Sequence, residues 1–374
     1  MSIIIGIIFL GFLVFIHELG HFAASRLSGV KVEAFSIGMG PVLLHKEWHG
    51  TDWRISLLPF GGYCAMKGEQ DFEEFYNGNT AVEKDSFYGV KAISRAFIGF
   101  AGPLSNFLFS VFAFFVIAIT GYTEIYLGNT VRLATEEYPE LHSPAKDAGI
   151  LSGDKIIRIN QCEINIFDDL VEEVSAHADE DIQVIVDRNG RELEFTVHTD
   201  RDEKSGAGKI GIMSVSDEDT LVRKEAKKYS FFPALARGFF ETFKVIKLSF
   251  KGIAMLFKGE VKASESVRGP AGITSMLGNV AKSGFSAGFK SGIVSVLNFM
   301  ALISVSLFIM NLLPIPILDG FLVLTSLIEA IFGLKVSPKA RNVVQYVGIA
   351  IIAGLFMLAL SGDFHYFSEL INAK

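Results

Sequence analysis

Four long apolar segments constrain this chain more than any other feature of its sequence. They cover roughly residues 2–24, 96–121, 293–313 and 343–360. A helix crosses the hydrocarbon core of a bilayer with about 20 residues, so each segment is a candidate span. Half of the 374 residues are hydrophobic and 20% are charged, which is more apolar than an ordinary soluble protein. The sequence therefore predicts a polytopic α-helical membrane protein with about four transmembrane helices.

These spans would form two membrane halves, residues 1–122 and residues 291–374. A cleavable signal peptide is the alternative for the first span, but no basic stretch precedes it and no small-residue cleavage site follows it. The net charge of -7 offers no basic excess for phosphates, so we expect no nucleic-acid partner. Two cysteines in 374 residues exclude a disulfide scaffold and a cysteine-based metal site.

The short loops predict the orientation. The loop after the first span contains Arg26, Lys31, Lys46, Arg54, Lys67, Lys84, Lys91 and Arg95, and the loop before the last span contains Lys335, Lys339 and Arg341. Loops rich in lysine and arginine stay in the cytoplasm. We therefore expect both short loops inside, and both termini and the long segment between the second and third spans outside.

The first part of that long segment reads as a small α/β domain over residues 123–215. Apolar or alternating runs predict strands at 155–160, 181–186 and 192–198, and a helix at 167–177. The run SPAKDAGILSGDKIIRINQCEI resembles the core of a PDZ domain. This resemblance implies an inserted extracytoplasmic PDZ-like domain that binds peptide ends by adding a strand to its sheet. It would act either as a size filter or as a docking module for a partner.

Residues 216–290 form a linker with reversed charge. Phenylalanine and aliphatic residues recur at three- or four-residue spacing from Phe232 to Phe257, and lysine and arginine fill the other faces. This pattern is typical of a basic amphipathic helix on the surface of a bilayer, here the outer surface. A helix packed on the preceding domain is the alternative.

The end of the first span contains a candidate metal site. His17-Glu18-Leu19-Gly20-His21 matches the pattern H-E-x-x-H. Spacing of four residues places the two imidazoles on one helical face, as two ligands of one Zn²⁺ require. Glu18 lies beside that face and could accept a proton from water that the metal activates. Two histidines and a glutamate are costly in a membrane span unless they are used.

A third ligand is needed, and Asp319 is a candidate. It follows the third span in Asn311-Leu-Leu-Pro-Ile-Pro-Ile-Leu-Asp319-Gly320. The two prolines stop a regular helix, and irregular backbone at membrane depth occurs where it lines a cavity. A helix-capping aspartate in a cytoplasmic loop is the alternative.

Together, HELGH and NLLPIPILDG resemble the site-2 protease family of intramembrane zinc metalloproteases, with its bacterial RseP-like branch as the nearest fit. Four further stretches agree: FSIGMGP at 35–41, LLPFGGYCAMKGE at 57–69, GFAGPLSNF at 99–107 and GPAGI at 269–273. The resemblance covers nearly the whole chain. It implies that His17, His21 and Asp319 bind Zn²⁺ and that Glu18 is the general acid/base.

The resemblance also implies a substrate site. Asn311 would lie near the substrate, and residues 53–66, including Gly61 and Gly62, would form a membrane-associated β-hairpin whose edge pairs with it. The substrates would be transmembrane segments of single-span proteins, such as anti-sigma factors or signal-peptide remnants, in the bacterial cytoplasmic membrane. The sequence departs from the family pattern in two places. It has room for one PDZ domain where many members have two, and Phe321 stands after Asp319-Gly320 where a second glycine is usual.

Two other functions remain open. A membrane scaffold would use the PDZ-like domain to hold a partner and would have an inactive metal site. A metal transporter would use the three ligands as a transit site, but such proteins commonly consist of repeated halves, and none are visible.

Overall fold

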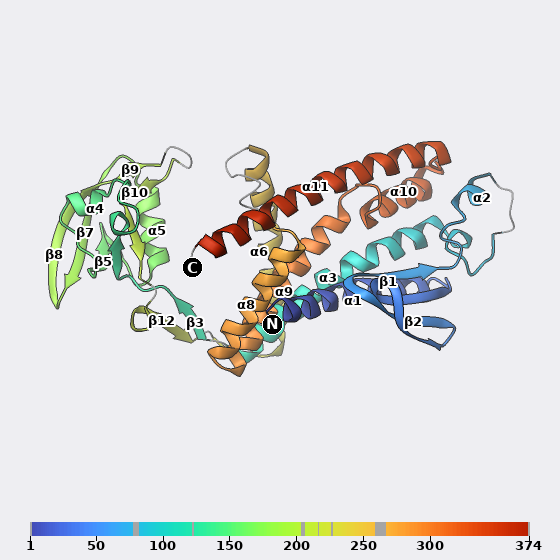
Figure 1. The fold of residues 1–374 in the computed structure, drawn as a ribbon, viewed down its shortest axis with the longest axis horizontal. Coiled ribbons are helices and arrows are strands. Elements are labelled where there is room, and N and C mark those ends of the chain that lie inside the picture. Colours follow the sequence, from blue (N-terminus) through green and yellow to red (C-terminus); the bar gives the residue numbers. More distant parts are fainter. Residues whose placement is uncertain are drawn as a thin grey trace. The chain divides into compact units, whose positions relative to one another are not determined.

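The computed structural model describes residues 2–77, 82–121, 123–202, 206–215, 217–225, 227–258 and 267–372. The chain divides into two compact units (Figure 1). The helical unit comprises residues 1–121 and 228–374, and the small unit comprises residues 122–227.

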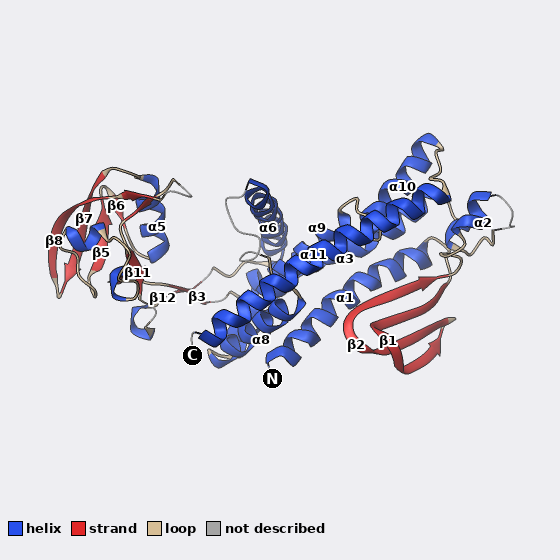
Figure 2. Cartoon of the chain, turned by 45° about the horizontal axis from the view of Figure 1, so that its top comes forward, coloured by secondary structure: helices blue, strands red, loops and turns tan. Residues whose placement is uncertain are grey.

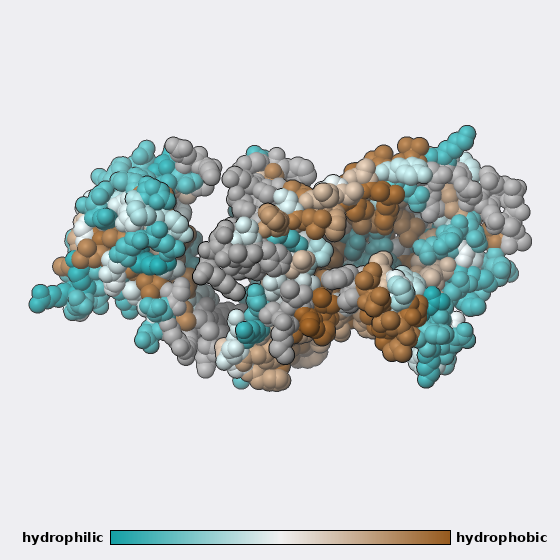
Figure 3. All heavy atoms as spheres, in the orientation of Figure 1, coloured by the Kyte–Doolittle hydropathy of each residue, from teal (hydrophilic) through white to brown (hydrophobic). Residues whose placement is uncertain are grey.

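The helical unit contains the four expected spans. They lie in α1 (Ser2–Leu27), α3 (Ala92–Thr120), α9 (Phe289–Leu312) and α11 (Pro338–Asn372). Within the described residues, each of the four helices has an apolar stretch long enough to cross a membrane, and the stretch of α11 runs from Val343 to Phe364. Figure 3 shows hydrophobic residues gathered over these helices. The four segments predicted from hydropathy thus each lie in a helix long and apolar enough to cross a membrane.

Helix α3 lies at the centre of the helical unit and contacts α1, α6, α9 and α10. Small residues let its neighbours approach closely, as is typical of membrane helices. A Cβ on Gly20 of α1 would overlap the carbonyl oxygen of Ala101 in α3. On another side, α10 (Asp319–Phe332) packs over Gly99 through Leu322 and Val323. The backbone of α3 therefore lies close to α1 and α10.

The linker contains a strand and two helices within its described residues, and the position of its first helix at the outer membrane surface stays a prediction. Its first part contains β12 (Val222–Glu225), and the helix that follows, α6 (Phe231–Lys258), packs against α3. Phe239 and Phe243 contact Phe107, and the Ser110 and Thr242 hydroxyls share a hydrogen bond of 3.3 Å. Part of the aromatic face of α6 thus packs against the apolar helix α3. Residues 259–266 of the linker lie outside the described part, and α8 (Pro270–Ser286) packs on α1 and α9.

The first loop forms two long bent strands, β1 (Val32–Trp48) and β2 (Thr51–Met66), followed by the short helix α2 (Phe72–Asn77). Residues 34–37 of β1 pair with residues 62–65 of β2 on one side and with 52–55 on the other. Residues 42–48 pair with 51–56. The expected hairpin is therefore folded back on itself into one sheet, the β1–β2 sheet, with its segments in the order 62–66, 32–37, 51–56 and 42–48. Figure 2 shows this sheet, whose edge at 62–66 lies toward α1.

The small unit is built around a four-stranded sheet of order β6-β5-β7-β8. These strands are β5 (Lys155–Ile159), β6 (Cys162–Glu163), β7 (Asp181–Arg188) and β8 (Arg191–His198), and α5 (Phe167–Ala176) packs on them. Alternate residues of β7, namely Ile182, Val184 and Val186, are fully buried. The strands and the helix thus lie within two residues of their predicted positions, because alternation with period two is a strong local signal.

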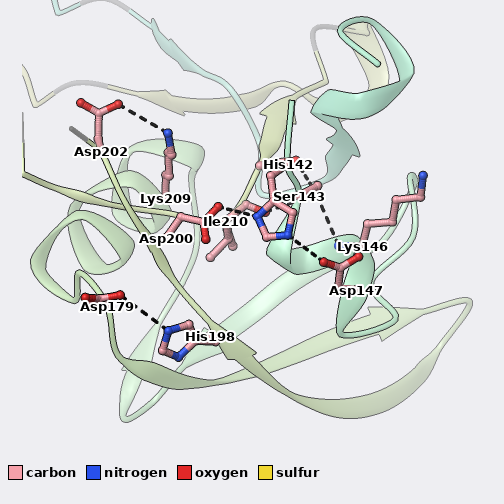
Figure 4. A network of polar contacts seen from close by, with 11 residues as sticks. His142, Ser143, Lys146, Asp147, Asp179, His198, Asp200, Asp202, Lys209 and Ile210 are labelled. Atoms are coloured by element: carbon pink, nitrogen blue, oxygen red, sulfur yellow. Dashed lines mark hydrogen bonds and ion pairs between the residues drawn. The ribbon is translucent and has the colours of Figure 1, made fainter. Parts of the chain in front are cut away.

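Short strand pairs complete the small unit. They are β3 (Thr123–Tyr126) with β12, β4 (Val131–Leu133) with β11 (Ile212–Ser214), and β9 (Asp200–Arg201) with β10 (Gly208–Lys209). A polar cluster ties β9 to α4 (Pro144–Asp147): His142 Nδ1 lies 2.7 Å from Asp200 and its Nε2 lies 2.9 Å from Asp147 (Figure 4). The Asp200 carboxylate, with Asp147, raises the pKa of His142 above its usual value.

Candidate metal centre

Three side chains that are far apart in the sequence converge inside the helical unit. His17 and His21 project from one face of α1, and Asp319 is the first residue of α10. Oδ2 of Asp319 lies 3.1 Å from Nε2 of His17 and 3.4 Å from Nε2 of His21. The two Nε2 atoms are 3.2 Å apart. The structure therefore brings together the three residues that the sequence suggested as ligands.

The chemistry of these atoms fits a metal ion. His17 and His21 are 9% and 7% exposed, and the buried Oδ2 of Asp319 lies beside their two Nε2 atoms. A buried carboxylate charge is costly unless it is paired or coordinates a metal. Two imidazoles and a carboxylate are a common ligand set of catalytic zinc, which leaves a fourth position for water.

The position of His21 depends on α3. Its Nδ1–H donates a hydrogen bond of 2.9 Å to the carbonyl oxygen of Ile98. The proton is then on Nδ1, and Nε2 keeps a lone pair for a metal. A Cβ on Gly102 would overlap Nε2 of His21, so the ring can lie here only against a glycine.

A second contact from α3 reaches His17. Nδ2 of Asn106 lies 3.1 Å from Nδ1 of His17, and the asparagine is fully buried. Asn106 lies in the stretch GFAGPLSNF, but no role was predicted for it. Asn106 is a polar residue within an apolar span, and such residues commonly face the interior of the helix bundle, where they have polar partners.

The turn before Asp319 explains how this carboxylate reaches the histidines. Helix α9 ends at Leu312, and Leu313 is extended. The chain then folds back so closely that a Cβ on Gly320 would overlap the carbonyl oxygens of Leu312 and Leu313. Asn311, the residue expected near the substrate, lies half-buried in the last turn of α9.

The edge strand of the β1–β2 sheet, at residues 62–66, lies beside Glu18. A Cβ on Gly62 would lie 3.1 Å from Cγ of Glu18 and 2.8 Å from the carbonyl oxygen of Ser36. Gly61 has a φ of 97°, which favours glycine. Glu18 is partly buried and is not one of the three converging ligands. The expected acid/base and the two expected glycines are therefore neighbours.

These features can be compared with known proteins. The family model described as "Peptidase family M50" matches residues 5–355. The chain belongs to peptidase family M50. The expected membership of the site-2 protease family is thereby confirmed, and the four apolar helices make this M50 chain a multi-pass membrane protein.

Several curated proteins resemble this M50 chain over nearly their full length. A "Putative zinc metalloprotease" of Treponema pallidum is 32% identical, with 98% of this chain and 99% of that protein covered. A protein of the same description from Campylobacter jejuni is 33% identical over 96% of this chain and 91% of its own length. One from Rhizobium meliloti is 32% identical over 95% and 94%.

Proposed function

We propose that this M50 chain is a zinc-dependent endopeptidase that hydrolyses peptide bonds within transmembrane segments of membrane proteins. The observation that supports this most is the convergence of Asp319 with His17 and His21, which lie beside Glu18 in a helix apolar enough to cross a membrane. A catalytically inactive scaffold is the alternative, and metal analysis of the purified protein with an assay of hydrolysis would separate the two.

Zinc is the cofactor in this proposal, in line with the descriptions of the relatives. The Nε2 atoms of His17 and His21 and the carboxylate of Asp319 hold it. When bound, zinc supplies Lewis-acid polarisation of the scissile carbonyl and activation of water.

Glu18 moves the proton in the reaction. Its carboxylate accepts a proton from the attacking water and later donates that proton to the leaving amine. Glu18 follows His17 directly in α1, so it lies beside the ligand face without sharing it. That position suits a base that contacts the water rather than the metal.

The substrate must unwind before it can react, because the carbonyls of a transmembrane helix are engaged in its own hydrogen bonds. We assign its binding to the edge strand at residues 62–66, which can pair with an extended segment. Gly61 and Gly62 allow the substrate to come close to Glu18, and Asn311, in the last turn of α9, offers an amide to the substrate. Single-span membrane proteins are the substrates in this proposal.

Substitution of Gly62 by valine should slow hydrolysis without removing zinc. The added side chain would meet the Ser36 carbonyl and Glu18, which displaces the edge strand or the carboxylate. A misplacement of about 1 Å lowers rates by up to roughly a hundredfold, so we expect a loss of about ten- to hundredfold in kcat. The control is Gly354→Val in α11, where nothing lies within 4 Å. Equal losses in both variants would argue against a role for the edge strand.

A route for water is also required. A cavity of about 220 Å³ reaches Asp319 and is lined farther along by Arg95, Glu329 and Lys335. Arg95 pairs with Glu329 at 2.6 Å and lies over the ring of Phe75. These charged residues belong to the side of the bundle that carries the basic loops. We therefore propose that water enters from the cytoplasm, with both termini and the small unit on the outer side of a bacterial cytoplasmic membrane.

The small unit offers a site for peptides. A groove of about 500 Å³ lies between α5 and residues 208–213, with an apolar wall that includes Phe167, Leu170 and Val171. A helix facing a short strand is suited to an extended peptide that adds to the strand. This groove favours docking of a peptide end over a purely steric filter.

An arginine in this groove separates the two roles. Val171 is 46% exposed and lines the groove, whereas Glu172 is exposed and does not. If peptides dock here, Val171→Arg should raise KM for a full-length substrate roughly tenfold, since a charge in an apolar contact costs on the order of 1–3 kcal/mol, and kcat should be unchanged. Glu172→Arg is the control. An unchanged KM in both variants would favour the filter.

A further inference from the structure

The ring of His17 is contacted on the side away from Asp319 by a side chain of α3. Asn106 is completely buried, and its amide lies 3.1 Å from Nδ1 of His17. Its backbone carbonyl accepts a hydrogen bond of 2.9 Å from the Ser304 hydroxyl of α9. Asn106 of α3 therefore contacts both α1 and α9. The main motion left to its side-chain amide is a rotation about the Cβ–Cγ bond.

A metal at Nε2 of a histidine requires the ring proton on Nδ1, and that N–H then needs an acceptor. For His21 the acceptor is the Ile98 carbonyl. For His17 the group at this position is the Asn106 amide, whose Oδ1 is buried with no hydrogen-bond partner in the described residues. A half-turn of the amide exchanges its oxygen and nitrogen.

The two amide orientations correspond to the two tautomers of His17. With Nδ2 toward Nδ1, the amide donates, and the ring proton lies on Nε2, 3.1 Å from Oδ2 of Asp319. With Oδ1 toward Nδ1, the amide accepts, and Nε2 carries a lone pair. Only the second orientation is compatible with a metal on Nε2.

We propose that Asn106 is a positioning residue that accepts the Nδ1–H of His17 and so selects the tautomer that binds zinc. This rests on the proposed function, in which His17 is a ligand. The two histidines then differ in one respect, because the acceptor for His21 belongs to the backbone and the acceptor for His17 is a replaceable side chain.

The test compares Asn106→Leu and Asn106→Asp in the purified full-length protein. Leucine has a similar size but no acceptor, whereas aspartate keeps the acceptor and removes the donor. Loss of such a partner typically weakens metal binding about ten- to hundredfold. We expect this loss for Asn106→Leu in a chelator competition with Zn²⁺, and a wild-type or tighter affinity for Asn106→Asp. The visible spectrum of the Co²⁺-substituted proteins should change with leucine alone.

The matched control is Ser110→Ala, which removes a buried hydrogen bond from the same helix without touching His17. It should bind zinc as the wild type does. A leucine variant that folds and binds zinc as tightly as the wild type would overturn the proposal, and so would an aspartate variant that binds weakly. If Asn106→Leu does not fold, the zinc affinity of Asn106→Asp tests the proposal by itself, and weak binding by that variant overturns it. A wild-type protein that binds no zinc would instead contradict the proposed function.

Discussion

Replacing Glu18 with glutamine is expected to lower hydrolysis of a transmembrane substrate by at least about a hundredfold, because a positioned general base contributes roughly 10²–10⁴-fold. Glutamine keeps the shape of the side chain but cannot accept a proton. Glu18 is not among the three atoms that converge at the candidate centre, so zinc should remain bound at the wild-type level. The variant thus separates proton transfer from metal binding.

The measurement needs purified protein in detergent or in vesicles, a cleavable transmembrane peptide, and metal analysis of the same sample. Glu33→Gln is a suitable control, since Glu33 is an exposed residue of β1. Hydrolysis by Glu18→Gln at the wild-type rate would contradict the assignment of Glu18. A wild-type protein that holds zinc but shows no hydrolysis with any transmembrane peptide would instead favour the scaffold.

Local patterns in the sequence predicted the elements of this fold well. The spans follow from length and hydropathy, and the strands of the small unit follow from alternation, as in Ile182, Val184 and Val186 of β7. HELGH places two imidazoles on one face because a helix repeats every 3.6 residues. Each of these predictions depends on residues that are close together in the chain.

Contacts between distant residues could not be predicted in this way. The hydrogen bond from His21 to Ile98 joins residues 77 positions apart, and the contact of Asn106 with His17 joins residues 89 positions apart. The amphipathic pattern of α6 indicated an apolar face but not its partner, since lipid and the aromatic side of α3 satisfy that face equally well. The pairing of residues 34–37 with two different segments of β2, one on each edge, could not be predicted either. The sequence of a strand does not say which segments will pair with its two edges.

Helix α3 is the common support of the candidate centre. It supplies the Ile98 carbonyl to His21 and the Asn106 amide to His17. Its first turns also hold α10, through the Arg95–Glu329 ion pair and the packing of Leu322 on Gly99. All three converging residues are thus positioned by one helix, although none of them belongs to it. A shift of α3 would therefore disturb the metal site without a change in any ligand.

Replacing Asp319 with alanine is expected to abolish stoichiometric zinc binding and, with it, hydrolysis. Two imidazoles of α1 would remain, but a catalytic zinc site needs three protein ligands. The variant should nevertheless fold, because it removes a carboxylate whose burial is costly without a metal.

This expectation has a thermodynamic counterpart. A ligand that binds only the folded state raises stability by RT ln(1 + [L]/Kd), so a zinc chelator should lower the melting temperature of the wild type. In Asp319→Ala the same chelator should have almost no effect, because the variant lacks the third ligand. Leu324→Ala, an exposed position in the same helix, is the control and should keep the chelator response. A chelator effect in Asp319→Ala as large as in the wild type would show that zinc stabilises this protein at another site.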